Sequence, residues 1–386
     1  MKYVVKFIVL ILTFSAIVSG SAIAADKGQF STEPKTNDGK KWRVAYYEGG
    51  EYLNYQQVFT ATVKGLMKLG WIEPMDIPVQ QGEQTDKLWQ WLSKNADSKY
   101  IEFISDGHYS AKWDDTFRKS TVSEINTRIR DKKDIDLLIA MGTWAGKDFA
   151  NDKLTVPTMV LSTSDPISAG IIKSVDDSGF EYIHAHVDPY RWERQLRLFH
   201  EIIDFKKLGV AYENTVNGRS YAAIDMVEKA ANERGFEIVS CYTKSDIADT
   251  QIAEDSVKKC FRDLANSTEA IYVTEQGGVN NRSIPELVKI INDNKIPTFA
   301  QYGSEMVKYG FFMSTSTAGF KYVGEFHAET FAKVFNGAKP SQLDQLFEEP
   351  PKIAINLKTS EIIGFVPPLI ILGAADEIFQ DIDIPK

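Results

Sequence analysis

Cysteine is scarce in this chain, with Cys241 and Cys260 as its two cysteines among 386 residues. Two cysteines are too few for a disulfide-built domain, and their spacing does not match the ligand pattern of zinc sites. A single bond between them is an open alternative. Cys241 is expected to end a strand and Cys260 to lie on the next helix, which packs on the same sheet, so their separation could suit a disulfide.

Motifs of catalysis and nucleotide binding are missing. The sequence contains no G-x-S-x-G, H-E-x-x-H, Walker A or G-x-G-x-x-G pattern. His184 and His186 share one face of an extended segment, and Asp188 is nearby, which leaves a metal site as an alternative. Paired histidines at this spacing are more typical of an interface or a hinge. We therefore expect neither an enzyme nor a bound metal or cofactor.

Long apolar runs are absent beyond the first residues of the chain. Lys2 and Lys6 precede an apolar stretch at 7–18, and small residues at 22–24 fit a cleavage site after Ala24. The run is too short to span a bilayer, so residues 1–24 are predicted to be a secretory signal peptide. No cysteine follows the cleavage site to carry a lipid. The sequence thus predicts a free periplasmic protein that is not a lipoprotein, with a flexible polar leader at 25–40.

Positive charge is in deficit, because the formal net charge is −9. An acidic protein of this kind argues against nucleic acid and anionic membrane surfaces as partners. The length exceeds what one ordinary core can serve and suits two domains.

Strands and helices alternate along the rest of the chain. Apolar strands are expected at 43–47, 135–142, 157–162, 207–213, 237–242, 270–275 and 297–302, with amphipathic helices between them. Strands in apolar runs separated by helices are typical of parallel sheets covered on both faces. Two such series predict two doubly wound α/β lobes. Residues 93–117 are less regular and are interpreted as an elaboration of the first lobe.

Polar side chains recur at the carboxyl ends of these strands. Ligands of open parallel α/β sheets bind at that edge, where helix N-termini present free amides. The candidate ligand-binding residues chosen on this basis are Tyr47, Glu48, Thr143, Trp144, Thr163, Ser164, Asp165, Asn214, Thr274, Gln276 and Tyr302.

Three of these positions have alternative interpretations. Asp165 precedes Pro166, and this pair is also typical of a helix start in which the carboxylate caps backbone amides. Trp144 is either part of the core or a stacking surface. Tyr46 and Tyr47 alternate across one strand, so only one of them can face inward.

The sequence resembles the ABC-transporter substrate-binding protein family that includes tryptophan- and tyrosine-binding members. The resemblance covers nearly all of the chain after the signal peptide. It is carried by MGTWAGKDFANDKLTVPTMVLSTSDPISAGIIKS, AIYVTEQGGVNN and IPTFAQYGSEMVKYG, and by NGAKPSQL followed by INLKTSEIIGFVPP and ADEIF. The family turn reads Thr-Asp-Pro, whereas here Ser164 separates Thr163 from Asp165.

The resemblance implies the type 1 periplasmic-binding fold, in which two lobes are joined by a three-segment hinge. We then expect lobe 1 at 41–185 plus 312–342 and lobe 2 at 186–311 plus 343–386. The crossovers are expected near 184–188, near 311–314 and between 340 and 353.

The implied function is the solute-binding component of an ABC importer. The partners would be a small polar solute, with an amino acid as the leading candidate, and a membrane permease, and the protein would act as a monomer. An amino-acid carboxylate would meet hydroxyls and helix amides, and the amine would meet Asp165 or Glu48. The alternative is a periplasmic receptor that signals to a membrane sensor protein.

Overall fold

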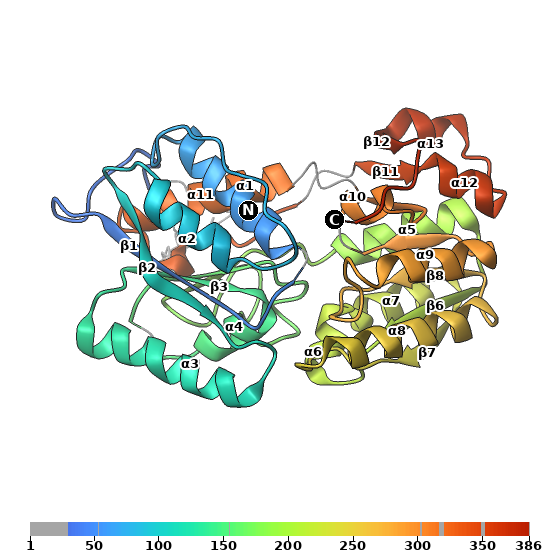
Figure 1. Cartoon of the computed structure of the whole chain (residues 1–386), viewed down its shortest axis with the longest axis horizontal. Helices are drawn as coiled ribbons and strands as arrows, with labels where there is room; N and C mark the ends of the chain where they lie inside the picture. The colour runs from blue at the N-terminus through green and yellow to red at the C-terminus, as the bar shows by residue number, and fades with distance from the viewer. Residues whose placement is uncertain are drawn as a thin grey trace, which may run out of the picture.

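The computed structural model describes residues 30–52, 54–153, 155–301, 303–315, 320–348 and 352–385, so the predicted signal peptide lies outside the described residues. Figure 1 shows two lobes side by side, each with helices on both faces of a sheet. One sheet has five strands in the order β2-β1-β3-β4-β5, and the other has seven in the order β12-β11-β10-β9-β8-β6-β7. In the described part of the chain, no helix is both long and apolar enough to cross a bilayer.

The first lobe contains the five-stranded sheet, and all of its strand pairs are parallel. Side chains of β1 alternate between two cores: Val44 and Tyr46 face one, and Ala45 and Tyr47 face the other. The elements of this lobe are β1 (Trp42–Glu48), α1 (Tyr55–Lys68), α2 (Asp86–Asn95), β2 (Ile101–Ser110), α3 (Asp115–Thr127), the π-helix η1 (Arg128–Lys132), β3 (Leu137–Met141), α4 (Gly142–Phe149), β4 (Thr158–Leu161), β5 (Ile183–Ala185), α11 (Lys321–Phe335) and the 3-10 helix η3 (Pro340–Gln342).

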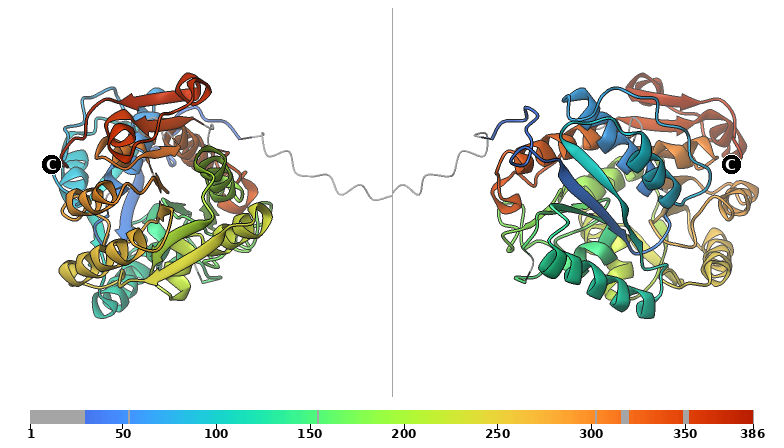
Figure 2. Two further views of the ribbon diagram at one scale, coloured as in Figure 1. Left: turned by 90° about the vertical axis from the view of Figure 1, so that its right-hand side faces the viewer. Right: turned by 60° about the vertical axis from the view of Figure 1, so that its left-hand side comes forward.

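The second lobe contains the seven-stranded sheet, onto which the left view of Figure 2 looks. Its strand pairs are parallel except β10–β11, because the chain returns to this sheet from the first lobe just before β11. The elements are α5 (Arg191–Ile203), β6 (Lys207–Tyr212), α6 (Val216–Tyr221), α7 (Ile224–Arg234), β7 (Glu237–Tyr242), α8 (Thr250–Ala265), β8 (Ala270–Val273), α9 (Ile284–Asp293), β9 (Thr298–Ala300), α10 (Ser304–Lys308), β10 (Met313–Thr315), β11 (Ile353–Asn356), α12 (Leu357–Ile363), α13 (Leu369–Ala374) and β12 (Ala375–Phe379).

The chain passes between the two sheets three times. It does so between β5 and α5, between β10 and α11, and between η3 and β11. The first passage follows Ala185, and the third lies between Gln342 and Ile353. The second is displaced: the assignment of 312–315 to the first lobe is wrong, because β10 pairs with β9 and β11 of the second sheet. The short apolar run FFMST gives no sign of which sheet it joins.

Helix ends follow local sequence signals. Asp114 accepts hydrogen bonds from the amides of Thr116 and Phe117 at the start of α3, and Asp249 caps α8 in the same way. Close packing of α1 on α11 depends on small residues. A Cβ at Gly324 would lie 2.5 Å from the backbone carbon of Ala61, so glycine lets the two helices approach.

The described part of the predicted leader is packed onto the first lobe, so its interpretation as flexible is wrong for residues 30–40. Phe30 packs against the core, and the indole of Trp71 donates to the Thr32 carbonyl at 2.9 Å. The amide of Asn336 in turn donates to the Glu33 carbonyl. Composition predicts flexibility here because these anchors are mostly backbone carbonyls, which any sequence supplies.

Residues 93–117 are not an addition to the first lobe but include its edge strand, β2. The register of β2 against β1 shifts between Val44, which faces Phe103, and Tyr46, which faces His108. An edge strand with an irregular register tolerates glycine and charge, as in IEFISDGHYS. This tolerance removes the alternating pattern by which a strand is recognised.

The segment after Pro166 forms turns rather than the expected helix. Asp165 still acts as a cap, because its carboxylate accepts the Ser168 amide at 2.9 Å. Gly170 then takes a φ of +71°, a left-handed conformation that ends helical geometry after one turn.

The cysteine alternative is settled by a disulfide. Cys241 of β7 and Cys260 of α8 are bonded, with 5.6 Å between their Cα atoms. The bond ties one edge strand of the second sheet to the helix that covers it.

Candidate functional site

A small cavity of about 30 Å³ lies between the two lobes, and we call it the inner cavity. The volume holds little more than a water molecule, so the lobes are closed on each other. The first lobe lines it with Tyr52, Tyr55, Trp113, Thr143, Ser162 and Ser164. The second lobe lines it with Tyr221, Ser245, Asp246, Glu275, Gln276 and Gly277.

Hydrogen bonds between the lobes hold this closed arrangement. The indole nitrogen of Trp144 donates to Asp246 Oδ2 at 2.9 Å, and the Ser164 hydroxyl donates to Glu275. Ser220 on α6 donates to the Asp165 carbonyl at 3.1 Å. These bonds join segments that follow β3 and β4 of the first lobe to α6 and to loops of the second lobe, and opening the lobes would break them together.

Backbone strain collects at the wall of the inner cavity. Ser162, directly after β4, has a φ of +55°, and Trp113 has a φ of +56°, which are unusual values for residues other than glycine. Such strain is typical of residues that a site holds in a fixed direction. The Trp113 ring lies against Gly49 and Gly50, where a Cβ would come within 2.7 Å and 2.5 Å of it, respectively. The two glycines after β1 therefore make room for this ring.

An unpaired hydroxyl faces the inner cavity. Ser162 is only 4% exposed, and its Oγ has no hydrogen-bond partner. Buried polar atoms in native proteins are nearly always paired, and exceptions call for an explanation. A ligand in the inner cavity would supply the missing partner.

Two carboxylates of the second lobe give the cavity its charge. Burial raises the pKa of Glu275 to about 7, although the Ser164 hydroxyl and the Arg191 charge act in the opposite direction. Burial also raises the pKa of Asp246, against hydrogen bonds from Tyr221 and Trp144. Both shifts mean that the closed lobes disfavour an uncompensated negative charge.

A larger space adjoins the inner cavity, and we call it the outer chamber. Its volume is about 1020 Å³, and it shares Tyr52, Trp113, Ser245 and Gly277 with the inner cavity. Glu48 lies at its wall, where it accepts hydrogen bonds from Tyr46 at 2.9 Å and from Thr85 at 2.6 Å. Burial raises the pKa of Glu48 to about 8.

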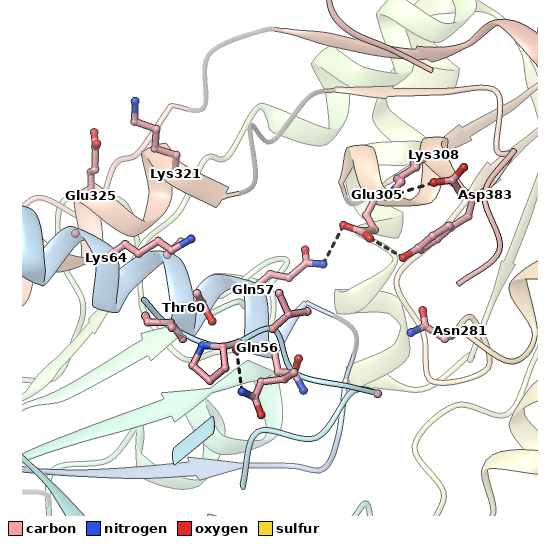
Figure 3. Close-up of a pocket in the computed structure, with 18 of the residues that line it drawn as sticks. Gln56, Gln57, Thr60, Lys64, Asn281, Glu305, Lys308, Lys321, Glu325 and Asp383 are labelled. Atoms are coloured by element: carbon pink, nitrogen blue, oxygen red, sulfur yellow. Dashed lines mark hydrogen bonds and ion pairs between the residues drawn. The ribbon is translucent and has the colours of Figure 1, made fainter. Parts of the chain in front are cut away.

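A third opening between the lobes has a different character. This polar groove, of about 910 Å³, is shown in Figure 3. Gln57 of α1 donates across it to Glu305 of α10 at 3.1 Å. Lysines line it from both lobes, namely Lys64, Lys68, Lys308 and Lys321.

Comparison with known proteins identifies the group to which the chain belongs. A family model described as ABC transporter substrate binding protein matches residues 110–378. This chain belongs to the ABC transporter substrate-binding protein family. A tyrosine-binding protein of Clostridioides difficile (strain R20291) is 26% identical over 182 residues, which cover 47% of this chain and 49% of that protein. The chain thus matches about half the length of that curated relative.

Solved structures of similar proteins show the same fold. An ABC domain from Streptococcus pneumonia in complex with L-Trp has a TM-score of 0.64 at 17% identity, covering 87% of this chain and 100% of that one. A conserved domain protein from Vibrio cholerae has a TM-score of 0.65 at 18% identity, covering 88% and 100%. A ligand-free, open substrate binding protein with adhesive properties from Clostridium difficile has a TM-score of 0.58 at 19% identity, also covering 88% and 100%. The two lobes of this substrate-binding protein thus form a type 1 periplasmic-binding fold.

The structure brings together three of the residues selected from the sequence of this substrate-binding protein. Thr143, Ser164 and Gln276 line the inner cavity, and Glu48 lines the outer chamber. Trp144 is buried behind the wall, where the Arg118 guanidinium lies 4.4 Å from its ring and Trp113 meets it edge-on. Of the two interpretations, the structure supports the core, because Trp144 is buried and does not line the inner cavity.

Other selected residues lie away from the inner cavity. Tyr47 points into the first-lobe core and donates to Asp148 at 2.8 Å, and Thr274 donates to the Ala211 carbonyl at 2.6 Å. Thr163 lines a separate small cavity, with its Oγ1 unpaired. Asn214 is exposed, and Tyr302 lies outside the described residues. The carboxylate of Asp165 does not line the inner cavity.

Sequence reasoning missed the rings and the charges of the inner cavity. Tyr52, Tyr55 and Trp113 lie in loops or at a helix start, which the strand-end rule does not examine. Asp246 follows β7 by four residues, and Glu275 stands between the two selected residues Thr274 and Gln276. A scan of every acidic residue after a strand would have found both.

The histidine pair is part of a buried network at the first crossover. His186 Nδ1 lies 3.0 Å from His327 Nε2, and His184 Nε2 lies 2.9 Å from the Asp344 carbonyl. Asp188 instead forms an ion pair with Arg194. Burial lowers the pKa of His184 to about 4 and that of His186 to about 3, so both are neutral at physiological pH. Among the described residues, no group of three metal-ligating side chains comes together.

Proposed function

We propose that this substrate-binding protein is the periplasmic solute-binding component of an ABC importer. It would capture a small polar solute between its lobes and present the closed form to a membrane permease. The supporting observation is the inner cavity, which is sealed by hydrogen bonds between the lobes and lined by rings, hydroxyls and carboxylates. A binder needs a space between its lobes and a hinge. The inner cavity holds little more than a water molecule, so the lobes would part to admit a solute and close around it.

The solute in this proposal carries an amine. Two carboxylates face the inner cavity, and an ammonium group is their natural partner. An amino acid is the leading candidate in view of the relatives, since one is named a tyrosine-binding protein and another was solved with L-Trp. The protein needs no catalytic group for this role, and the proposal assigns it no reaction.

The proposal is tested by a thermal-shift screen on protein freed of bound ligand by unfolding and refolding. Amino acids, small peptides, amines, nucleosides and sugars form the panel. A ligand present at a hundred times its Kd stabilises the folded form by about 2.7 kcal/mol, which gives a clear rise in Tm. Uptake of the labelled ligand by cells with and without the gene then tests transport. Binding without any loss of uptake in the deletion strain would contradict the importer role.

A further inference from the structure

We propose that the inner cavity takes a small organic cation, a ligand with at least one ammonium group and no free carboxylate. This inference rests on the proposed function, because it names the class of solute that the same cavity would hold. It keeps the amine of the proposed solute but departs from the amino acid that the sequence and the relatives suggest. Three features of the inner cavity support it: the negative charge of its lining, its aromatic rings and an unpaired hydroxyl.

The charge of the inner cavity has one sign. Asp246 and Glu275 line it, and no lysine, arginine or histidine does so among the residues that the structure describes. A zwitterion would bring its own carboxylate into a space of this size beside two others. Like charges a few ångströms apart repel strongly where water is excluded. A ligand that carries only positive charge avoids this cost.

Two arginines lie near the inner cavity, but neither lines it. Arg118 donates to Asp148 at 3.0 Å and stacks on the Trp144 ring. Arg191 stacks on the Trp192 ring and lines a neighbouring cavity with Thr163. Their positive charges act on the inner cavity from a distance, but neither guanidinium lines it. A ligand carboxylate there would therefore have no arginine to pair with.

Aromatic rings complete the match to a cation. Tyr52, Tyr55, Trp113 and Tyr221 all line the cavity, and the first two rings lie with centroids 5.4 Å apart. The faces of such rings attract ammonium groups, most strongly when water is excluded. The Tyr221 hydroxyl donates to Asp246 at 2.7 Å and so fixes that carboxylate at the cavity edge.

Ser162 is an independent sign that a ligand belongs there. Its side chain is almost fully buried, its Oγ is unpaired, and it lines the cavity from a strained backbone. A hydroxyl oxygen accepts hydrogen bonds from an ammonium group. One ammonium could therefore contact two carboxylates and the hydroxyl of Ser162.

The outer chamber is also acidic. Glu51, Glu83 and Asp86 line it against the cations Lys112 and Arg282, and Arg282 is already bound to Glu254 at 2.8 Å. Glu48, whose pKa burial raises to about 8, adds little charge there at neutral pH. The polar groove is more evenly balanced, because its four lysines face three carboxylates. Of the two openings between the lobes, the outer chamber therefore suits a cationic ligand better.

Matched ligands test the inference directly. Tyramine and tyrosine share a ring and an amine and differ in the carboxylate, as do tryptamine and tryptophan. The acid 3-(4-hydroxyphenyl)propanoate keeps the ring and the carboxylate but lacks the amine. Titration calorimetry at neutral pH on ligand-free protein should give at least one amine a tenfold or greater advantage over its amino acid, and no binding of the acid. Putrescine and choline extend the cation set.

Variants locate the effect in the inner cavity. Asp246→Asn and Glu275→Gln each keep the shape and remove one charge, and each should weaken binding of the best cation about ten- to a hundredfold. Glu305→Gln is the matched control, since it removes a carboxylate that also bonds across the lobes but lines the polar groove. It should leave the affinity within about twofold.

Three outcomes would overturn the inference. The first is an amino acid that binds more tightly than its matched amine, which leaves the proposed function intact. The second is an equal loss of affinity in Glu305→Gln and Asp246→Asn. The third is a panel in which no cation binds. If a sugar, nucleoside or peptide then raises the Tm, the protein is a solute-binding protein whose ligand is not a cation. If no compound in the panel raises the Tm, the proposed function is contradicted as well.

Discussion

The two lobes bring different chemistry to the inner cavity. The first lobe contributes hydroxyls and most of the rings, and the second contributes both carboxylates. Neither half is a complete site: rings without charges would bind any flat apolar molecule, and exposed carboxylates would bind a cation only weakly. If the proposed function holds, the ligand meets both kinds of group only when the lobes close. Changes to either lobe therefore test different parts of the site.

The largest effect is expected from Gly142→Ala, which would break the ring wall of the first lobe. Gly142 has a φ of +82°, and a Cβ there would lie 1.8 Å from the Tyr55 hydroxyl. The backbone conformation and the displacement of Tyr55 together should cost about 2–5 kcal/mol of stability. Ligand affinity should also fall by more than tenfold, because Tyr55 lines the cavity.

Gly235→Ala is the matched control for this change. Gly235 has a φ of +74° at the end of α7 in the second lobe, and a Cβ there meets nothing within 4 Å. It should lose about 1–2 kcal/mol of stability from the backbone alone and keep its affinity. Urea unfolding and titration calorimetry on both variants separate the two effects. Equal losses would show that the contact with Tyr55 is unimportant.

The next effect concerns the framework of the second lobe rather than its charges. The Cys241–Cys260 disulfide closes a loop with a sequence separation of 19, and neither cysteine lines the inner cavity. The Cys241→Ser/Cys260→Ser variant should lose about 3 kcal/mol of stability, from the entropy that the bond removes from the unfolded chain. Its ligand affinity at a temperature where it is folded should not change. A loss of affinity without a loss of stability would instead make the bond part of the site.

The sequence predicts the strands and helices of the two lobes much better than it predicts the residues that line the inner cavity. Apolar strand runs and helix caps are local signals, and the strand-end rule leads to Thr143, Ser164 and Gln276, which line the inner cavity. It misleads at Tyr47, because strand alternation turns that side chain into the core. Trp113 cannot be found in this way, since its position depends on a register shift in β2 and on two glycines after β1. Contacts between distant loops carry no local pattern.

A smaller effect follows from the carboxylates of the second lobe and depends on pH. Burial in this structure raises the pKa of Glu275 to about 7 and raises that of Asp246, so we expect the closed form to hold protons more tightly than a form in which water reaches both carboxylates. The stability of the closed, ligand-free form is then greatest below the ordinary carboxylate pKa and is lost as the pH rises towards about 7. Small-angle scattering should give a smaller radius of gyration at about pH 5 than at about pH 8.

Glu275→Gln sharpens this result. Glutamine is neutral at every pH and still accepts the Ser164 hydrogen bond, so the variant should show a weaker dependence of the radius on pH. The titration of Asp246 would account for the pH dependence that remains. A radius that does not change with pH in the unmodified protein would mean that the carboxylates do not control closure.

The smallest effect is expected from a carboxylate on the other lobe, at Asp165. Asp165, like Asp246, takes part in a hydrogen bond between the lobes, since its backbone carbonyl accepts from Ser220. Its side chain, however, accepts the Ser168 amide at 2.9 Å and does not line the inner cavity. Asparagine caps backbone amides about as well as aspartate does. Asp165→Asn should therefore keep both the Tm and the affinity, whereas Asp246→Asn should lose affinity. Calorimetry on the two variants under identical conditions compares one carboxylate from each lobe. A tenfold loss of affinity in Asp165→Asn would mean that the ligand amine contacts Asp165 of the first lobe. The assignment of the charged groups to the second lobe alone would then be wrong.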